Sequence, residues 1–269
     1  MLGKDHISIS MAFILPFLIP LFFLGSVDAL FLAVLIISVL IGSLLPDTDC
    51  GGKATIYYRF PAIDQFMKKV VGKSIIFLFS HLISSKRIKT EHDVKDEHRG
   101  IMHSPIGVLF SSLMLVIPLI IFGIVFSLLN WSVLLIIFLG LIIGQLLHLF
   151  EDSCTISGIN WLFPFKTKEL RGKIYTFSRD PERMDIRPMA YAGVLYLLSL
   201  LLVVGYGFNI ISEINIWLLL VGVLICEVLI LVFIILSSQS NSSAWMVKKG
   251  TIKQVNKYSR RLKKNMGGI

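Results

Sequence analysis

Charged residues are scarce in this chain. Asp, Glu, Lys and Arg make up 16% of its 269 residues, whereas hydrophobic residues make up 55%. A soluble domain has about 25% charged residues, so this composition is typical of an integral membrane protein. Cysteine is also scarce, and the three cysteines are scattered and odd in number, which favours reduced thiols over a disulfide framework. The chain has neither an internal repeat nor a low-complexity tract.

Long apolar runs are the main feature that the sequence does have. A helix needs about 20 mostly apolar residues to span a bilayer. Six segments meet this requirement, at residues 8–24, 28–46, 102–128, 131–150, 190–208 and 216–237. The first could pass for a signal peptide, but no small-residue cleavage site follows it and the chain turns directly into the second run. We therefore expect an all-α integral membrane protein with about six transmembrane helices.

The distribution of basic residues predicts the orientation of these helices. All 26 Lys and Arg residues precede the first helix, follow the sixth, or lie between helices two and three or four and five. The other three connections contain none, so every basic segment falls on one face. The positive-inside rule then predicts a multi-pass protein of the cytoplasmic (inner) membrane with both termini in the cytoplasm. The basic tail, residues 246–269, is expected to contact anionic lipid headgroups, and binding of nucleic acid is not expected.

Two of the inner loops are long enough to carry structure. Residues 62–71 have apolar side chains at helical spacing, which predicts an amphipathic helix in the membrane interface. The apolar positions are Ile63, Phe66, Met67, Val70 and Val71, and the polar ones are Asp64, Gln65, Lys68 and Lys69. Residues 159–165 and 172–178 are candidates for a strand pair in a small cytoplasmic loop subdomain. We expect a core of residues 1–165 with an insert at 50–97, then residues 166–245 with helices five and six, then the tail.

Potential metal ligands gather at the predicted cytoplasmic ends of the first four helices. They are His6, Asp47, Asp49, His98, His103, His148 and Asp152. His148 and Asp152 are four residues apart, so both can reach one ion from the same side of a helix. His98 and His103 can share an ion only if the helix begins between them, near Gly100; otherwise they serve neighbouring ions.

The mixture of imidazoles and carboxylates predicts a site for one or two divalent ions. Nitrogen and oxygen ligands suit zinc first, with manganese or iron as alternatives, whereas magnesium prefers oxygen and water. Any one of these histidines alone would be read as a polar anchor at the interface. Glu227 lies well inside the sixth helix, and we expect it to be protonated or satisfied within the bundle.

Other polar residues beside the ligands have expected roles of their own. Asp49 is a candidate ligand or catalytic base, and Arg99 has a planar group of donors suited to a phosphate. Ser104 and Thr155 are expected to orient ligands from outside the coordination shell.

The motifs PDTD, HRGIMHS and HLFEDSCTISG, in this order, resemble the inner-membrane metal-dependent hydrolases of the YdjM/YbcI type, whose namesake is described as LexA-regulated. The resemblance covers residues 1–165, and we expect the insert, the last two helices and the tail to be additional to it. The matching positions are His6, Asp47, Asp49, His98, Arg99, His103, Ser104, His148, Asp152, Thr155, Gly158 and Pro164. The resemblance implies metal-dependent hydrolysis. A looser similarity to zinc-dependent phospholipases C suggests a phosphoester substrate by analogy.

These observations lead to one main functional hypothesis and two alternatives. The main hypothesis is a metal-dependent hydrolase that acts on a phospholipid or lipid phosphate at the cytoplasmic headgroup level, by metal-activated water. The first alternative is an ion or solute transporter, although such sites usually lie near the middle of the bilayer, often within repeats. The second is a membrane scaffold with a structural metal.

Overall fold

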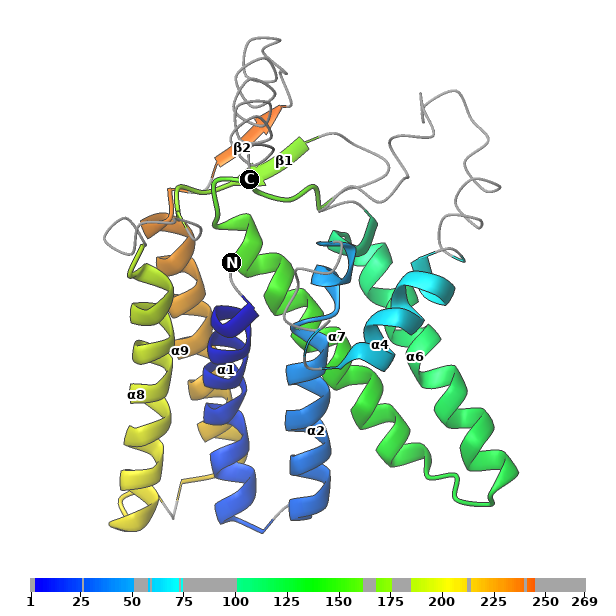
Figure 1. Ribbon diagram of the computed structural model, residues 1–269. Coiled ribbons are helices and arrows are strands. Elements are labelled where there is room, and N and C mark those ends of the chain that lie inside the picture. The colour runs from blue at the N-terminus through cyan, green and yellow to red at the C-terminus, as the bar shows by residue number, and fades with distance from the viewer. Residues whose placement is uncertain are drawn as a thin grey trace, which may run out of the picture.

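The computed structural model describes residues 3–25, 27–50, 58, 60–72, 74, 101–161, 168–175, 185–211, 214–239 and 241–244. Within these residues, the long helices form three hairpins (Figure 1). They are α1 (Gly3–Phe23), α2 (Ala29–Gly42), α6 (Pro105–Val125), α7 (Trp131–Ser153), α8 (Arg187–Gly207) and α9 (Ile216–Ser237). The shorter elements are η1 (Pro46–Cys50), α4 (Pro61–Phe66), η2 (Met67–Gly72), η4 (Ile101–His103), β1 (Lys168–Arg171) and β2 (Asn241–Ala244).

The expectation of an all-α membrane protein is confirmed. Five of the long helices are long and apolar enough to cross a membrane, namely all except α2. The helix predicted at 28–46 is shorter, because α2 ends after 14 residues at Gly42. The N–H groups of Leu44 and Leu45 bond to the carbonyls of Ile41 and Gly42, which are three residues back, and the chain tightens into η1.

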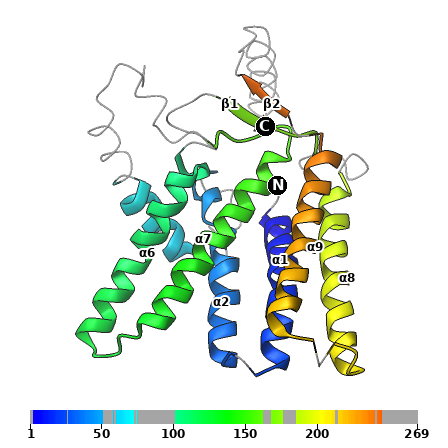
Figure 2. The same ribbon diagram turned by 180° about the vertical axis from the view of Figure 1, so that it is seen from behind.

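The three hairpin turns lie together at one end of the helices, at the bottom of Figure 1. The N-terminus and the β1–β2 pair lie at the opposite end, and the view from behind agrees (Figure 2). The turns span residues 24–28, 126–130 and 208–215, and their sequences contain no Lys or Arg. The candidate ligands that the structure describes therefore lie at the end of the bundle opposite these turns. The helix ends there are the ones joined by the connections that contain Lys and Arg.

Glycines allow α2 and α7 to pack closely. A side chain at Gly144 would overlap the carbonyl oxygen of Val39, and one at Gly140 would overlap Ser38. On the α2 side, a side chain at Gly42 would overlap the backbone of Leu141. Small residues four positions apart commonly allow helices to approach closely in membranes, where the hydrophobic effect contributes little to helix association. This contact brings the end of α2 against the last two turns of α7.

The segment predicted as an amphipathic helix is folded onto the bundle. Met67 and Val71 are buried, and they pack in one apolar cluster with Leu44, Leu45 and Met102. Two details of the prediction are wrong: Asp64, assigned to the polar face, is 1% exposed, and Val70, assigned to the apolar face, is 42% exposed. The buried face follows Asp64, Met67 and Val71, which are three and four residues apart, and the chain changes from the α-helical α4 to the π-helical η2 at Met67.

The small strand pair differs from the predicted one. The observed ladder is antiparallel and joins β1 to β2, so residues beyond α9 supply the second strand. Within the predicted region, Ile159 pairs with Leu170 and Thr155 with Ile174, but only as isolated bridges. Gly158 adopts a φ of +59°, which turns the chain after α7 back toward β1. Residues 162–167 and 176–184, which include the remainder of the predicted strands, lie outside the described residues.

Arg187 links the ends of α8 and α9. Its guanidinium donates to the carboxylate of Asp185, to the carbonyl oxygen of Ser237 at 2.9 Å and to that of Lys173 at 2.8 Å. The hydroxyl groups of Tyr191 and Ser237 lie 2.7 Å apart beside it. The second half of the bundle is therefore joined at this end by polar contacts of its own.

Candidate metal centre

The carboxyl end of α7 supplies two candidate ligands. His148 and Asp152 lie one turn apart, so their side chains leave the same side of the helix. They are 0% and 1% exposed. The hydroxyl of Thr155 donates to the carbonyl oxygen of Asp152 at 2.7 Å and satisfies part of the helix end. This contact holds the backbone of Asp152, which is the kind of contact that the orienting role expected for Thr155 requires.

His103 reaches the site from the turn that precedes α6. It is the last residue of η4, and Ser104 follows as the N-cap residue of α6. The hydroxyl oxygen of Ser104 accepts a hydrogen bond from the N–H of Gly107 at 3.2 Å. Because α6 begins only after this cap, His103 is not part of the long helix, and Ser104 fixes the point at which His103 projects.

Two buried serines and a glutamine hold α6 against α7 below the site. The hydroxyl of Ser111 donates to Oε1 of Gln145 at 2.5 Å, and Nε2 of Gln145 donates to the hydroxyl oxygen of Ser112 at 2.8 Å. All three side chains are completely buried. A buried polar group that has its partners makes a helix contact specific. Gln145 lies one turn before His148, so this contact sets the start of α6 relative to the ligands of α7.

Asp47 and a backbone carbonyl come from the end of α2. The carbonyl oxygen of Ser43 lies 2.7 Å from Nδ1 of His148, and this hydrogen bond depends on the close contact between α2 and α7. Pro46 begins η1, and Asp47 follows it. The side chain of Asp47 is 12% exposed, against 0–1% for the side chains of His6, His103, His148 and Asp152. Among these five side chains, that of Asp47 is the most exposed to solvent.

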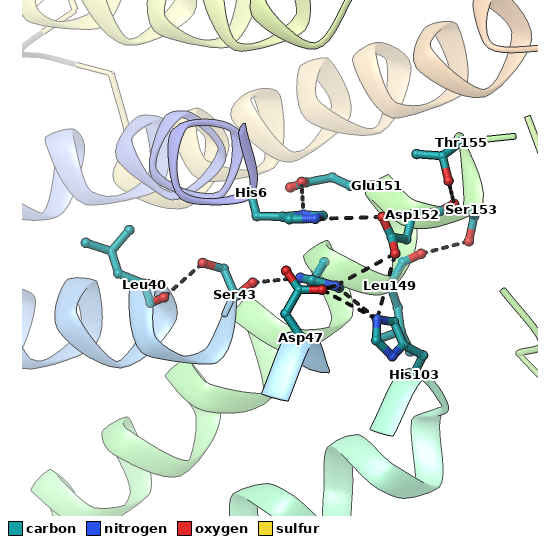
Figure 3. Close-up of polar contacts among 11 residues, drawn as sticks. His6, Leu40, Ser43, Asp47, His103, Leu149, Glu151, Asp152, Ser153 and Thr155 are labelled. Carbon is teal, nitrogen blue, oxygen red and sulfur yellow. Dashed lines mark hydrogen bonds and ion pairs between the residues drawn. The ribbon is translucent and has the colours of Figure 1, made fainter. Parts of the chain in front are cut away.

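His6 enters the site from the first turns of α1. Its ring stacks on that of His148, with centroids 3.8 Å apart and planes inclined by 18°. Nδ1 of His6 lies 2.6 Å from Oε2 of Glu151, and Nε2 lies 3.7 Å from Oδ1 of Asp152 (Figure 3). His6 thus joins the N-terminal helix to the end of α7 through two acidic residues.

These side chains converge on a small volume between the ends of the helices (Figure 3). Nε2 of His148 lies 3.6 Å from Oδ1 of Asp47 and 3.9 Å from Oδ2 of Asp152. Nε2 of His103 lies 3.9 Å from Oδ1 of Asp47 and 3.8 Å from Oδ2 of Asp152. The Nε2 atoms of His103 and His148 are 3.3 Å apart. Atoms at these separations can bind one ion that lies between them.

Hydrogen bonds determine which nitrogen of two histidines faces this volume. A backbone carbonyl can only accept, so Nδ1 of His148 carries the proton that Ser43 accepts, and Nε2 retains a lone pair. Nδ1 of His6 lies 2.6 Å from Oε2 of Glu151, and it donates to this oxygen when Glu151 is ionised. Nε2 of His6 then has a lone pair but no hydrogen-bond partner among the described residues, although the ring is fully buried.

These residues fit a metal ion, because a cation would give the buried Nε2 atom of His6 a partner. A buried polar atom without a partner is costly, and a cation between the imidazoles and carboxylates would satisfy the orphaned Nε2 of His6. Two groups have ligand atoms that all lie within 4.8 Å of one another: His6, His148 and Asp152, and Asp47, His103 and His148. Both groups consist of buried side chains that can hold an ion.

Three of the predicted site residues are not located by the structure. Asp49 belongs to η1, but its side chain is not described, and His98 and Arg99 lie outside the described residues. Their expected roles remain predictions. The structure does bring together the other five predicted ligands, which come from four separate parts of the chain.

Sequence reasoning missed Glu151 and Gln145. Glu151 stands inside the motif HLFED, and its signal was an acidic residue three positions after His148 in an otherwise apolar helix. Gln145 gave the same kind of signal one turn earlier. Both lie three residues from His148, and the four-residue spacing of His148 and Asp152 does not include them although they share that side of the helix.

Comparison with known proteins supports the assignment made from the motifs. No curated protein and no solved structure matches the chain. A family model described as YdjM inner membrane protein matches residues 1–239. The match continues through α9, so α8 and α9 lie within the family region and are not an addition to it, as the resemblance over residues 1–165 had suggested. The chain belongs to the YdjM inner membrane protein family.

Proposed function

We propose that this protein is a membrane-embedded, metal-dependent hydrolase of phosphoester lipids, with phospholipids or lipid phosphates as its substrate class. The observation that carries the proposal is the convergence of three imidazole Nε2 atoms and two carboxylates at the ends of membrane helices. A mixed set of nitrogen and oxygen ligands suits zinc, with manganese or iron as alternatives.

The two ligand groups share His148, and this limits how the ions can be bound. Nδ1 of His148 is engaged with Ser43, so a single nitrogen remains and serves one ion. We assign that ion to His103, His148 and Asp47, together with Oδ2 of Asp152. A second ion, if bound, takes Nε2 of His6 and Oδ1 of Asp152, and the undescribed Asp49 and His98 are its candidate further ligands. Asp152 would then bridge the two positions.

In the proposed reaction, the bound ion and the side chains of the protein have separate roles. A bound divalent ion supplies Lewis acidity, which polarises a phosphoryl oxygen and lowers the pKa of water. Asp49 is the proposed base that accepts the proton of the attacking water. Arg99 carries a fixed charge and a fork of donors, and is proposed to hold the phosphate of the substrate. Asp47, the most exposed of the located ligands, borders the path by which the substrate enters.

The surroundings of the site support a lipid substrate. The indole N–H of Trp161 donates to the hydroxyl of Ser153 at 2.7 Å, so a half-buried aromatic ring is fixed beside the end of α7. Tryptophan is enriched at the level of lipid headgroups. The three hairpin turns without Lys or Arg lie at the far end of the bundle, so the positive-inside rule favours a cytoplasmic site with both termini inside. The basic tail is proposed to contact anionic headgroups.

A structural metal is the second candidate, and the burial of the ligands favours it. His6, His103 and His148 are completely buried, which is usual for an ion that is closed off by protein ligands. The two candidates differ in whether a coordination position stays open. Binding of Co²⁺ in place of the native ion, followed by its optical spectrum with and without inorganic phosphate, distinguishes an open position from a closed one.

The function is tested with purified protein in mixed micelles of detergent and lipid. Release of headgroup or phosphate is measured from phospholipids and from lipid phosphates, with Zn²⁺ or Mn²⁺ added. We expect hydrolysis of one of these lipid classes, lost in Asp152→Asn and retained in His92→Ala. His92 lies in the charged stretch KTEHDVKDEH at residues 89–98 and has no assigned role. Stoichiometric metal without hydrolysis of any phosphoester lipid would contradict the hydrolase and favour the structural ion.

A further inference from the structure

Glu151 is buried beside the proposed metal centre, and its carboxyl group faces Nδ1 of His6. It is 2% exposed and follows His148 by three residues. Its Oε2 lies 2.6 Å from Nδ1 of His6, which is the shortest contact that joins α1 to the site. In Figure 3 the carboxylate lies on the side of the His6 ring away from Asp47 and His103. Glu151 is therefore separated from the convergence point by the ring of His6.

This contact has a specific chemical consequence for His6. A neutral imidazole carries one proton, and in water the proton prefers Nε2 over Nδ1. A carboxylate at hydrogen-bond distance from Nδ1 reverses this preference, because it accepts from an N–H but offers no proton in return. The proton then stays on Nδ1, and the lone pair of Nε2 faces Oδ1 of Asp152. Ser43 does the same for His148 through its carbonyl oxygen.

We propose that Glu151 is a positioning residue, which holds His6 in the Nδ1–H tautomer and presents Nε2 of His6 to the cation. This role rests on the proposed metal centre. A carboxylate behind a ligating imidazole also increases the basicity of the ligand, and loss of such a partner typically weakens metal binding by about 10- to 100-fold. A cation held by Nε2 of His6 would compensate the buried charge of Glu151 through the imidazole ring.

The opposing interpretation is that Glu151 is itself a ligand. Its second oxygen, Oε1, is buried and has no hydrogen-bond partner among the described residues. Direct coordination by Oε1 would make Glu151 independent of His6, whereas positioning makes the effect of Glu151 depend entirely on the Nε2 atom of His6. This difference can be measured by a double-mutant cycle.

The cycle uses His6→Asn and Glu151→Gln, alone and together, with the affinity for Zn²⁺ measured by competition with a chromophoric chelator. The amide nitrogen of asparagine lies near the position of Nδ1, so His6→Asn keeps a donor for Glu151 and removes only Nε2. We expect Glu151→Gln, whose amide oxygen still accepts from Nδ1–H, to weaken Zn²⁺ binding about tenfold, and Glu151→Leu to weaken it about 100-fold. In the His6→Asn background neither substitution should weaken binding further. An equal loss in both backgrounds would overturn the proposal in favour of direct ligation.

A measurement without metal tests the same contact independently. Nitrogen NMR of protein labelled with ¹⁵N-histidine, with the signal of His6 identified by its loss in His6→Asn, reports the tautomer directly. We expect the Nδ1–H form in the metal-free wild type and its loss in Glu151→Leu. An Nε2–H form in the wild type would overturn the proposal even if Zn²⁺ binds. Failure of the wild type to bind any metal would instead overturn the proposed function, and with it the presentation of His6 to a cation.

Discussion

Among the residues that the structure describes, two glutamates are buried, Glu151 at the end of α7 and Glu227 in the middle of α9, and their surroundings are opposite. Glu151 bonds to His6, and His6 in turn lies against Asp152 and the ring of His148. Glu227 is completely buried, but neither of its oxygens has a hydrogen-bond partner among the described residues. An acidic residue inside a membrane helix is a candidate functional site in either case. What separates the two is the number of chain segments that meet there.

The end of α7 is a meeting point, whereas the middle of α9 is not. Elements α1, η1 and η4 bring side chains to the end of α7 from distant parts of the sequence. The side chains around α9 are mostly apolar, and many of them are exposed on the surface of the bundle. The difference favours the end of α7 over Glu227 as the candidate functional site, and the expectation that Glu227 is protonated or satisfied within the bundle stays a prediction.

The largest effect is expected from Gly144→Val, which changes no polar residue of the site. The valine side chain would overlap the backbone of Val39 and Ser43 and force α2 away from α7. The bond from His148 to Ser43 would then be lost together with metal binding and the folded, monodisperse state. Size-exclusion chromatography in detergent and metal analysis measure both. The matched control is Gly222→Val in α9, where a side chain meets nothing within 4 Å. Equal behaviour of the two variants would contradict the role assigned to the α2–α7 contact.

Asp152→Asn is expected to have the next largest effect, which is a loss of metal affinity, and to leave the fold intact. Oδ1 of Asp152 faces His6 and Oδ2 faces His103 and His148, so the substitution removes charge from both ligand groups. We expect metal affinity to fall by at least about 100-fold at an unchanged elution volume. Asp28→Asn is the control, since Asp28 caps α2 at the opposite end and asparagine caps equally well. Retention of metal by Asp152→Asn would remove Asp152 from the ligand set.

Arg187→Ala tests whether the second half of the bundle is held independently of the site. It removes charge-assisted hydrogen bonds to Asp185 and to two backbone carbonyls. We expect a loss of stability of about 3 kcal/mol without loss of bound metal, measured by thermal unfolding and metal analysis. A loss of metal would show that the two halves are coupled.

The same contact predicts a dependence on pH. The hydrogen bond from Arg187 lowers the pKa of Asp185 below its ordinary value. The contribution to stability is therefore present above the ordinary pKa of an aspartate and is lost as the pH falls through the lowered pKa of the folded protein. Asp185→Asn should be less stable than the wild type at neutral pH, and this difference should shrink in acid. A difference that is constant with pH would exclude the ion pair as its cause.

The smallest effect is expected at Glu227. A buried carboxyl group without a partner is unfavourable, so Glu227→Leu should raise the stability by about 1 kcal/mol and leave metal content and hydrolysis unchanged. Thermal unfolding and the micelle assay measure these quantities. A loss of activity, or a metal-dependent flux in proteoliposomes that depends on Glu227, would support the transporter that the sequence left as an alternative.

The sequence predicted the helices and most of the ligands, because both follow local rules. Apolar runs define the helices, and the four-residue spacing of His148 and Asp152 places them on one side of α7. The pairing of Glu151 with His6 could not be predicted in this way, since it depends on which face of α7 meets α1. The inward position of Asp64 depends in the same way on which face of α4 and η2 packs against the bundle.

Two other features depended on contacts between distant segments. The pairing of β1 with β2 joins residues about 70 positions apart, and no local pattern indicates that partner. The α2–α7 contact was easier to predict from the sequence, because Gly140 and Gly144 form a small-residue motif that is visible there. That motif indicates that a helix packs closely against another but does not identify the partner helix.

Elemental analysis of the detergent-purified protein tests the central claim most directly. Plasma mass spectrometry would be applied to the wild type, to His148→Ala and to Glu227→Gln, each after loading with metal and removal of the excess. The account predicts one or two equivalents of zinc, manganese or iron in the wild type and in Glu227→Gln, and at least one equivalent less in His148→Ala. Absence of metal from the wild type, or its retention at the same level in His148→Ala, would contradict a metal centre at the end of α7.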